Sequence, residues 1–283
     1  MGNGIAHVFA INGFDVMLFD INEKALAKSI INIEKNINRQ ISKELLTADA
    51  GRSSLERIQL VTNLEQAVTS VDIVIEAATE NESLKLEIFS SLSTLVSKET
   101  ILATNTSSIS IGKIAAVTKH PENVIGMHFM NPVPVMKLVE IISGYKTSEK
   151  TIAVITQLSK KLGKTPVACN DYPGFVANRI LMPMINEAIE SLQNGVAGVS
   201  EIDSIMKLGM GHPMGPLQLA DFIGLDVCLS ILNVMHQGYG KQKYSPNPVL
   251  INLVTSGDLG VKSGKGFYDY SNGIKNPTVA YKA

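Results

Sequence analysis

The segment 1–20, MGNGIAHVFAINGFDVMLFD, decides the fold because a glycine-rich helix start is followed by a short strand that ends in an acid. Gly2 and Gly4 lead directly into a short amphipathic helix, and Asp20 closes the strand predicted over residues 15–19. A dinucleotide-binding unit places glycine at a helix N-terminus, where backbone N–H groups hold pyrophosphate, and an acid after the next strand, where it binds ribose hydroxyls. Gly2, Gly4 and Asp20 are therefore candidate cofactor ligands.

The same residues have simpler interpretations. Gly2 and Gly4 can be flexible terminal residues, and Asp20 can be the N-cap of the next helix. The order of the elements favours a dinucleotide, and a carboxylate at Asp20 would repel a 2′-phosphate, which favours NAD over NADP. Neither the first strand nor an earlier glycine pair precedes Gly2. We expect either a true start further upstream, which we favour, or a truncated and catalytically impaired chain.

Outward from this segment, the first 170 residues alternate short β-rich runs with helical patterns, which is typical of βαβ units around a parallel sheet. Helical spacing of apolar residues predicts crossover helices over residues 23–43 and 84–96. The predicted strands cover residues 15–19, 59–62, 72–77, 101–104, 124–128 and 136–142.

The pattern changes after residue 170. From Pro173-Gly174-Phe175 to about residue 256 the apolar residues follow helical spacing, and the glycine-rich, basic stretch 262–268 is typical of a loop. We therefore predict two domains. Residues 1–172 form a Rossmann-type, doubly wound α/β domain with a mainly parallel sheet that lacks its first strand, and residues 173–283 form an all-α domain.

The composition argues against several classes of function. Lys and Arg number 25 against 26 Asp and Glu, so no net field favours nucleic acid or an anionic membrane. Cys169 and Cys228 provide neither a disulfide framework nor a metal-binding cluster, which predicts a cytoplasmic location. The apolar runs are too short for a membrane span, and the stretch near Met1 does not resemble a signal peptide.

Three groups of polar residues follow predicted strands, where α/β sheets bind ligands. Glu80 follows the strand over residues 72–77, Asn105-Thr106-Ser107-Ser108 follows the next strand, and His128 ends an apolar strand before Pro132 and Pro134. Each group has a structural alternative. The hydroxyls can cap a helix, and a lone histidine among Met and Phe can be a packed core residue.

Glu140 favours a catalytic interpretation of His128. A carboxylate in the apolar strand Leu138-Val139-Glu140-Ile141-Ile142 is unfavourable unless it is paired. Because the two prolines predict a turn between them, Glu140 can lie beside His128 on an adjoining strand. That pairing would orient the imidazole and raise its basicity.

Several motifs follow one another over essentially the whole chain: residues 105–108, residues 128–134, Glu140, Pro173-Gly174-Phe175-Val176-Ala177-Asn178-Arg179, Met214-Gly215-Pro216, Asp221 and Gly224-Leu225-Asp226. Together they resemble the L-3-hydroxyacyl-CoA dehydrogenases, and most closely the bacterial 3-hydroxybutyryl-CoA dehydrogenases. The resemblance implies an oxidoreductase of fatty acid or butanoate metabolism. It would interconvert (S)-3-hydroxybutyryl-CoA and acetoacetyl-CoA by hydride transfer to or from NAD, without a metal.

The resemblance also implies roles for individual residues. His128 would be the general acid/base, Glu140 would support the imidazolium, and Ser107 and Asn178 would hydrogen-bond the substrate oxygen. Coenzyme A would contact Asn36 and Lys43, and a homodimer would form through the second domain. The implied cofactor contacts, together with Gly2 and Gly4, are Asp20, Glu80, Lys85, Asn105, Ser107, Asn131 and Lys262.

Two alternatives stay open. A β-hydroxyacid dehydrogenase of the same architecture would act without coenzyme A, although Lys43 and the set of Ser107, His128 and Asn178 argue against it. A catalytically silent relative would keep the fold as a binding or dimerising module.

Overall fold

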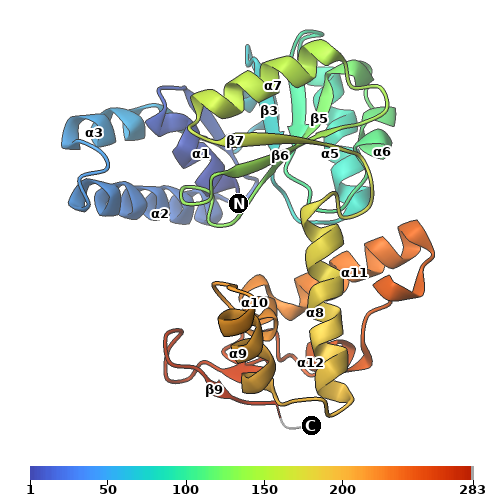
Figure 1. Ribbon diagram of the computed structural model, residues 1–283. Coiled ribbons are helices and arrows are strands. Elements are labelled where there is room, and N and C mark those ends of the chain that lie inside the picture. The colour runs from blue at the N-terminus through green and yellow to red at the C-terminus, as the bar shows by residue number, and fades with distance from the viewer. Residues whose placement is uncertain (282–283) are drawn as a thin grey trace. The chain divides into compact units, whose positions relative to one another are not determined.

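The computed structural model describes residues 1–281, and the chain divides into two compact units, Met1–Asp171 and Tyr172–Ala283. The first unit is built from alternating strands and helices, and the second is mainly helical (Figure 1).

The N-terminal unit follows the predicted alternation of elements. Its helices are α1 (Gly2–Ile11), α2 (Glu23–Ser42), α3 (Ala48–Glu56), α4 (Leu64–Ala67), α5 (Glu82–Leu95), α6 (Ile111–Ala116) and α7 (Glu149–Lys161), with the 3-10 turn η1 (Pro121–Asn123). Its strands are β1 (Val16–Phe19), β2 (Ile58–Val61), β3 (Ile73–Glu76), β4 (Ile101–Thr104), β5 (Val124–Phe129), β6 (Leu138–Ser143) and β7 (Thr165–Asn170).

Within residues 1–281, the strands of this unit form a parallel pair, β1-β2, and a five-stranded sheet in the order β3-β4-β5-β6-β7. All neighbouring strands are parallel except β5 and β6. In the described part of the chain, no strand joins β1 to β3, and the two sheets stay separate. The prediction of a doubly wound α/β fold with a mainly parallel sheet is confirmed.

The two faces of the five-stranded sheet are distinguished by the alternation of side chains along β5. Ile125, Met127 and Phe129 belong to one apolar core with residues of α1 and α7. Gly126 points to the other face, where a Cβ at this position would lie 2.9 Å from Cδ1 of Ile111 in α6. His128 follows the same alternation as Gly126, so it lies on the α6 face.

Short polar side chains start most helices of this unit. Asn22, which begins α2, accepts hydrogen bonds from the backbone N–H groups of Lys24 and Ala25. Such caps satisfy N–H groups that have no partner inside the helix. The equivalent caps of α3, α4, α5, α6 and α7 are Thr47, Asn63, Asn81, Ser110 and Ser148.

One strand of the sheet was not among those predicted. Strand β7 contains Pro166 and lies at the edge of the sheet, where a missing N–H group is tolerated. Since the proline and the flanking polar residues weaken the strand pattern, the sequence suggested only a change of pattern here.

The C-terminal unit is a helical bundle with a short hairpin. Its helices are α8 (Ala177–Gln193), α9 (Val199–Gly209), α10 (Pro216–Ile223), α11 (Leu225–Tyr239) and α12 (Pro248–Thr255), with the 3-10 turn η2 (Gln242–Tyr244). Strands β8 (Tyr268–Asp269) and β9 (Thr278–Val279) pair antiparallel, a detail that the all-α prediction did not include. The core is formed by buried residues of α8 to α12 together with Phe267, Tyr268 and Tyr270.

Among residues 1–281, no single helix is long and apolar enough to cross a membrane. Only the sharply bent pair of α10 and α11 reaches that length and apolarity together. The described residues also place no group of three or more His, Cys, Asp or Glu side chains where a metal ion could be held.

Candidate active site

His128 and Glu140 form a buried pair in the middle of the five-stranded sheet. The antiparallel register places His128 of β5 directly opposite Glu140 of β6, and directly opposite residues project on the same face of a sheet. Nδ1 of the histidine lies 2.8 Å from Oε2 of the glutamate. The two residues are 8% and 3% exposed. The adjacency predicted from the apolar surroundings of Glu140 is present.

Asn105 holds the end of β5 next to this pair. Its side-chain oxygen accepts a hydrogen bond of 2.8 Å from the backbone N–H of Phe129, the residue after His128. Its own backbone N–H donates to the carbonyl of Glu76 at the end of β3. The structure therefore uses Asn105 to join the ends of three adjacent strands, a role that the sequence did not suggest.

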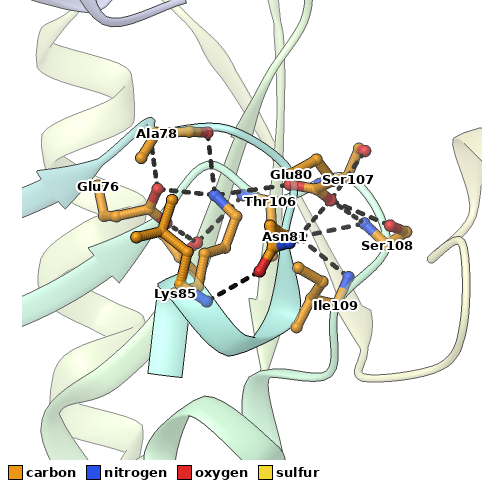
Figure 2. A network of polar contacts seen from close by, with 11 residues as sticks. Glu76, Ala78, Glu80, Asn81, Lys85, Thr106, Ser107, Ser108 and Ile109 are labelled. Atoms are coloured by element: carbon orange, nitrogen blue, oxygen red, sulfur yellow. Dashed lines mark hydrogen bonds and ion pairs between the residues drawn. The ribbon is translucent and has the colours of Figure 1, made fainter. Parts of the chain in front are cut away.

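Glu80 organises the loop that carries Ser107 (Figure 2). Its Oε1 accepts hydrogen bonds from Oγ1 of Thr106 at 2.6 Å and from the backbone N–H and hydroxyl groups of Ser107 and Ser108, at 2.9 to 3.1 Å. Burial alone would raise the pKa of Glu80. The hydrogen bonds from Thr106, Ser107 and Ser108 and the charge of Lys85 outweigh burial and hold the pKa below its usual range. Glu80 is thus an ionised anchor for the loop.

Lys85 lies next to Glu80 and is 1% exposed. Its Nζ is 2.7 Å from Oε1 of Glu76 and 3.5 Å from Oε2 of Glu80. Thr104 donates a hydrogen bond of 2.7 Å to the other carboxylate oxygen of Glu76. A buried ion pair of this kind needs such additional hydrogen bonds. The structure places Lys85 inside this network and not on an open surface.

Glu76 was not predicted as a site residue, although the sequence pattern around it indicates a buried carboxylate. It ends the apolar strand Ile73-Val74-Ile75-Glu76 as a carboxylate that requires a buried partner, which is the reasoning that singled out Glu140. Its partner Lys85 comes nine residues later in the chain, in the first turn of α5.

The start of α1 offers backbone groups to an anion. Met1 precedes the helix, and within the described chain no side chain caps it, so N–H groups of the first turn point to the end where an anion can bind. Gly4 also allows close packing, because a Cβ there would lie 3.0 Å from Cβ of Val133. Both glycines belong to a well-formed helix, so the interpretation of them as flexible residues is wrong.

Asp20 follows β1 and is half-buried. Its Oδ1 accepts a hydrogen bond from the backbone N–H of Asn22, which is the N-cap of α2. The interpretation of Asp20 as the helix cap is therefore wrong. Asp20, Glu80 and Ser107 each follow the carboxyl end of a parallel strand, where α/β folds bind ligands, and together with the start of α1 their polar groups fit a dinucleotide in chemistry.

The remaining predicted site residues lie in other elements of the two units. Asn131 is exposed after β5. Asn36 in α2 and Lys43 at its C-terminal end are about two helical turns apart, so they share one face. In the C-terminal unit, Asn178 is buried in the first turn of α8, and Lys262 forms a half-exposed ion pair with Asp226.

Comparison with known proteins gives matches over both units. The model of the family described as 3-hydroxyacyl-CoA dehydrogenase, NAD binding domain, matches residues 1–172. The model described as 3-hydroxyacyl-CoA dehydrogenase, C-terminal domain, matches residues 174–270.

Individual relatives match over nearly the full chain. A 3-hydroxybutyryl-CoA dehydrogenase of Bradyrhizobium diazoefficiens is 49% identical over 278 residues, which cover 98% of this chain and 94% of the relative. One from Clostridioides difficile is 46% identical over 271 residues, 96% of each chain. The crystal structure of (S)-3-hydroxybutyryl-CoA dehydrogenase from Ralstonia eutropha superposes with a TM-score of 0.90 at 46% identity, covering 100% of this chain and 96% of the other.

Proposed function

Because the chain belongs to the 3-hydroxyacyl-CoA dehydrogenase family, we propose that it interconverts (S)-3-hydroxybutyryl-CoA and acetoacetyl-CoA with NAD. The observation that carries the proposal is the buried pair of His128 and Glu140, which provides a proton acceptor fixed in one orientation. The names of the relatives support the substrate.

His128 acts as general acid/base in this proposal. With Nδ1 held by Glu140, Nε2 takes the proton of the substrate 3-hydroxyl during oxidation and returns it during reduction. The carboxylate of Glu140 stabilises the imidazolium that forms, because the two groups lie in a buried environment where their attraction is weakly screened. Bound NAD supplies the hydride acceptor.

Two further side chains are proposed to bind the substrate oxygen. Ser107 offers a hydroxyl at the carboxyl end of β4, and its backbone N–H and hydroxyl are oriented by Glu80. Asn178 offers an amide from the first turn of α8. Lys85 acts through Glu80, since it is enclosed between that residue and Glu76.

The proposed cofactor contacts are the start of α1 with Gly2 and Gly4 for the pyrophosphate, Asp20 for a ribose, and Glu80, Asn105, Ser107, Asn131 and Lys262 for the nicotinamide end. The carboxylate of Asp20 would repel a 2′-phosphate, which supports NAD over NADP. Asn36 and Lys43 are proposed to contact coenzyme A from one face of α2. We further propose a cytoplasmic location, because the two cysteines of the sequence, Cys169 and Cys228, are too few for a disulfide framework.

We also propose that the chain forms a homodimer through the helical unit. Ile205, Leu208 and Met210 at the end of α9 and beyond it expose large apolar side chains, and so do Phe222 and Val227. Exposed apolar side chains are often covered in an oligomer. Sedimentation at micromolar concentration is expected to give twice the mass of the chain, and a monomer at that concentration would refute the dimer.

Replacement of the proposed base tests the mechanism. His128→Gln is expected to lower turnover at least about a hundredfold, which is the contribution typical of a positioned base. The dissociation constant for NADH, measured by fluorescence titration, should stay nearly unchanged. The matched control is His120→Gln, because His120 lies on the surface beside Glu122 and is expected to keep full turnover. Near-normal turnover of His128→Gln would remove His128 from the mechanism.

A further inference from the structure

Lys164 is a buried lysine in the turn between α7 and β7. It is 9% exposed, and its Nζ donates hydrogen bonds to the carbonyl oxygens of Val133, at 2.5 Å, and Met136, at 2.8 Å. Among residues 1–281, no carboxylate lies within ion-pair distance of this ammonium group. Burial lowers the pKa of Lys164. Burying a cation without hydrogen-bond partners is unfavourable. The ammonium group of Lys164 therefore depends on the two carbonyl oxygens.

Both carbonyls belong to residues 130–137, the connection between β5 and β6, which we call the β5–β6 loop. Thr165, the residue after Lys164, also donates its backbone N–H to this loop, at 2.8 Å from the carbonyl of Lys137. The turn after α7 therefore holds the loop at Val133, Met136 and Lys137.

Helix α1 contacts the same loop. A Cβ at Gly4 would lie 3.0 Å from Cβ of Val133 and 3.7 Å from Cδ of Pro134. The helix can approach this closely only because Gly4 has no side chain. The loop is thus bound by Lys164 and packed against the helix whose first turn is proposed to hold pyrophosphate.

The position of this loop affects both halves of the proposed chemistry. It carries Asn131, a proposed cofactor contact, and its two ends continue into the strands of His128 and Glu140. A shift of the loop would therefore change the cofactor site and the strand ends next to the catalytic pair together. Small displacements of this kind reduce catalysis because reacting groups must be closely aligned.

We infer that Lys164 is a positioning residue, whose ammonium group holds the β5–β6 loop against α1 in the arrangement that binds NAD and aligns His128. The inference rests on the proposed function. Lys164 acts through the carbonyls of Val133 and Met136 and not by contact with the reacting atoms. A lysine that only stabilised the fold would lower the unfolding temperature but leave the affinity for NADH unchanged.

Three variants of the full chain test this inference. Lys164→Met removes the donors at similar length, and we expect the NADH dissociation constant to rise about tenfold and kcat to fall about tenfold, as for loss of hydrogen bonds from a charged donor. Lys164→Arg keeps the charge but displaces the donors, and an intermediate rise of about threefold is expected. The control is Lys161→Met, at the exposed C-terminal end of α7, which should match the wild type. NADH binding is measured by fluorescence, with circular dichroism to verify folding.

The inference is supported if the NADH dissociation constant rises from the wild type to Lys164→Arg and again to Lys164→Met. It is overturned if either folded Lys164 variant keeps the wild-type dissociation constant and kcat, or if neither variant folds. If the wild type binds NADH but oxidises no 3-hydroxyacyl-CoA, the proposed function fails. In that case the dissociation constants of the variants still decide the role of Lys164.

Discussion

At the scale of single residues, the function of His128 depends on what lies opposite it. A histidine within an apolar strand is commonly a packed core residue. Here the strand register brings a carboxylate to 2.8 Å from Nδ1, which fixes the orientation of the ring and the position of its proton. The proposed base therefore depends on β6 as much as on β5.

Single residues also show what the sequence could predict. Glu140 and Glu76 are carboxylates in apolar strands, so the energetic cost of burying a charge predicts a partner for each. The sequence did not predict the partners of Lys164, because they are backbone carbonyl groups, which every residue type has. Asn105 was expected to contact the cofactor, and its bond to the backbone of Phe129 could not be predicted without the pairing of the strands.

At the scale of secondary-structure elements, two buried aspartates connect the helices and the hairpin of the C-terminal unit. Asp203 of α9 accepts hydrogen bonds from the first backbone N–H groups of α10 and from the hydroxyl of Tyr268. Asp221 of α10 accepts from the backbone N–H groups of Phe267 and Tyr268 and from the hydroxyl of Tyr270. These bonds attach the hairpin to the bundle.

The titration of Asp221 should make stability depend on pH. Burial, and to a lesser extent repulsion from Asp203, raises the pKa of Asp221 to about 6. The hydrogen bonds that Asp221 accepts lower the pKa but do not outweigh burial. Because the folded chain then binds more protons than the unfolded chain between about pH 4 and 6, the contribution of Asp221 to stability falls as pH rises through this window. Between pH 5 and 7.5 the loss of stability is on the order of 1 kcal/mol.

Urea unfolding at pH 5 and 7.5 measures this effect. We expect the stability of the wild type relative to Asp221→Asn, which does not titrate, to be smaller at pH 7.5 by that amount. Asp15→Asn, at a highly exposed side chain, should follow the wild type at both pH values. If the difference in unfolding free energy between the wild type and Asp221→Asn stays constant or grows with pH, the raised pKa is contradicted.

Elements with a strong local pattern were predicted well. Strand β4 has the predicted bounds, and α2 was expected over residues 23–43. Strand β7 was not predicted, because an edge strand with a proline has a weak pattern. The hairpin of β8 and β9 was not predicted either, since it depends on Asp221, which lies far away in the sequence.

At the scale of the whole molecule, the residues that the sequence predicts for the site are found in two units. Ser107, His128 and Glu140 belong to the N-terminal unit and Asn178 to the C-terminal unit. The order of βαβ elements and the change to helical spacing near residue 170 predicted these two classes of structure. Within the described residues, β1 and β2 pair separately from the five-stranded sheet, and the prediction that the first strand is absent from residues 1–172 stays a prediction.

The central claim is that this chain oxidises 3-hydroxyacyl thioesters of coenzyme A with NAD. The direct measurement follows NADH absorbance with (S)-3-hydroxybutyryl-CoA and with free (S)-3-hydroxybutyrate at equal concentration. We predict that the thioester is oxidised at least about a hundredfold faster, because binding of the coenzyme A portion contributes to alignment at the reacting carbon. Equal rates would indicate a β-hydroxyacid dehydrogenase that acts without coenzyme A. A folded chain that oxidises neither compound would contradict the account and support a catalytically silent relative.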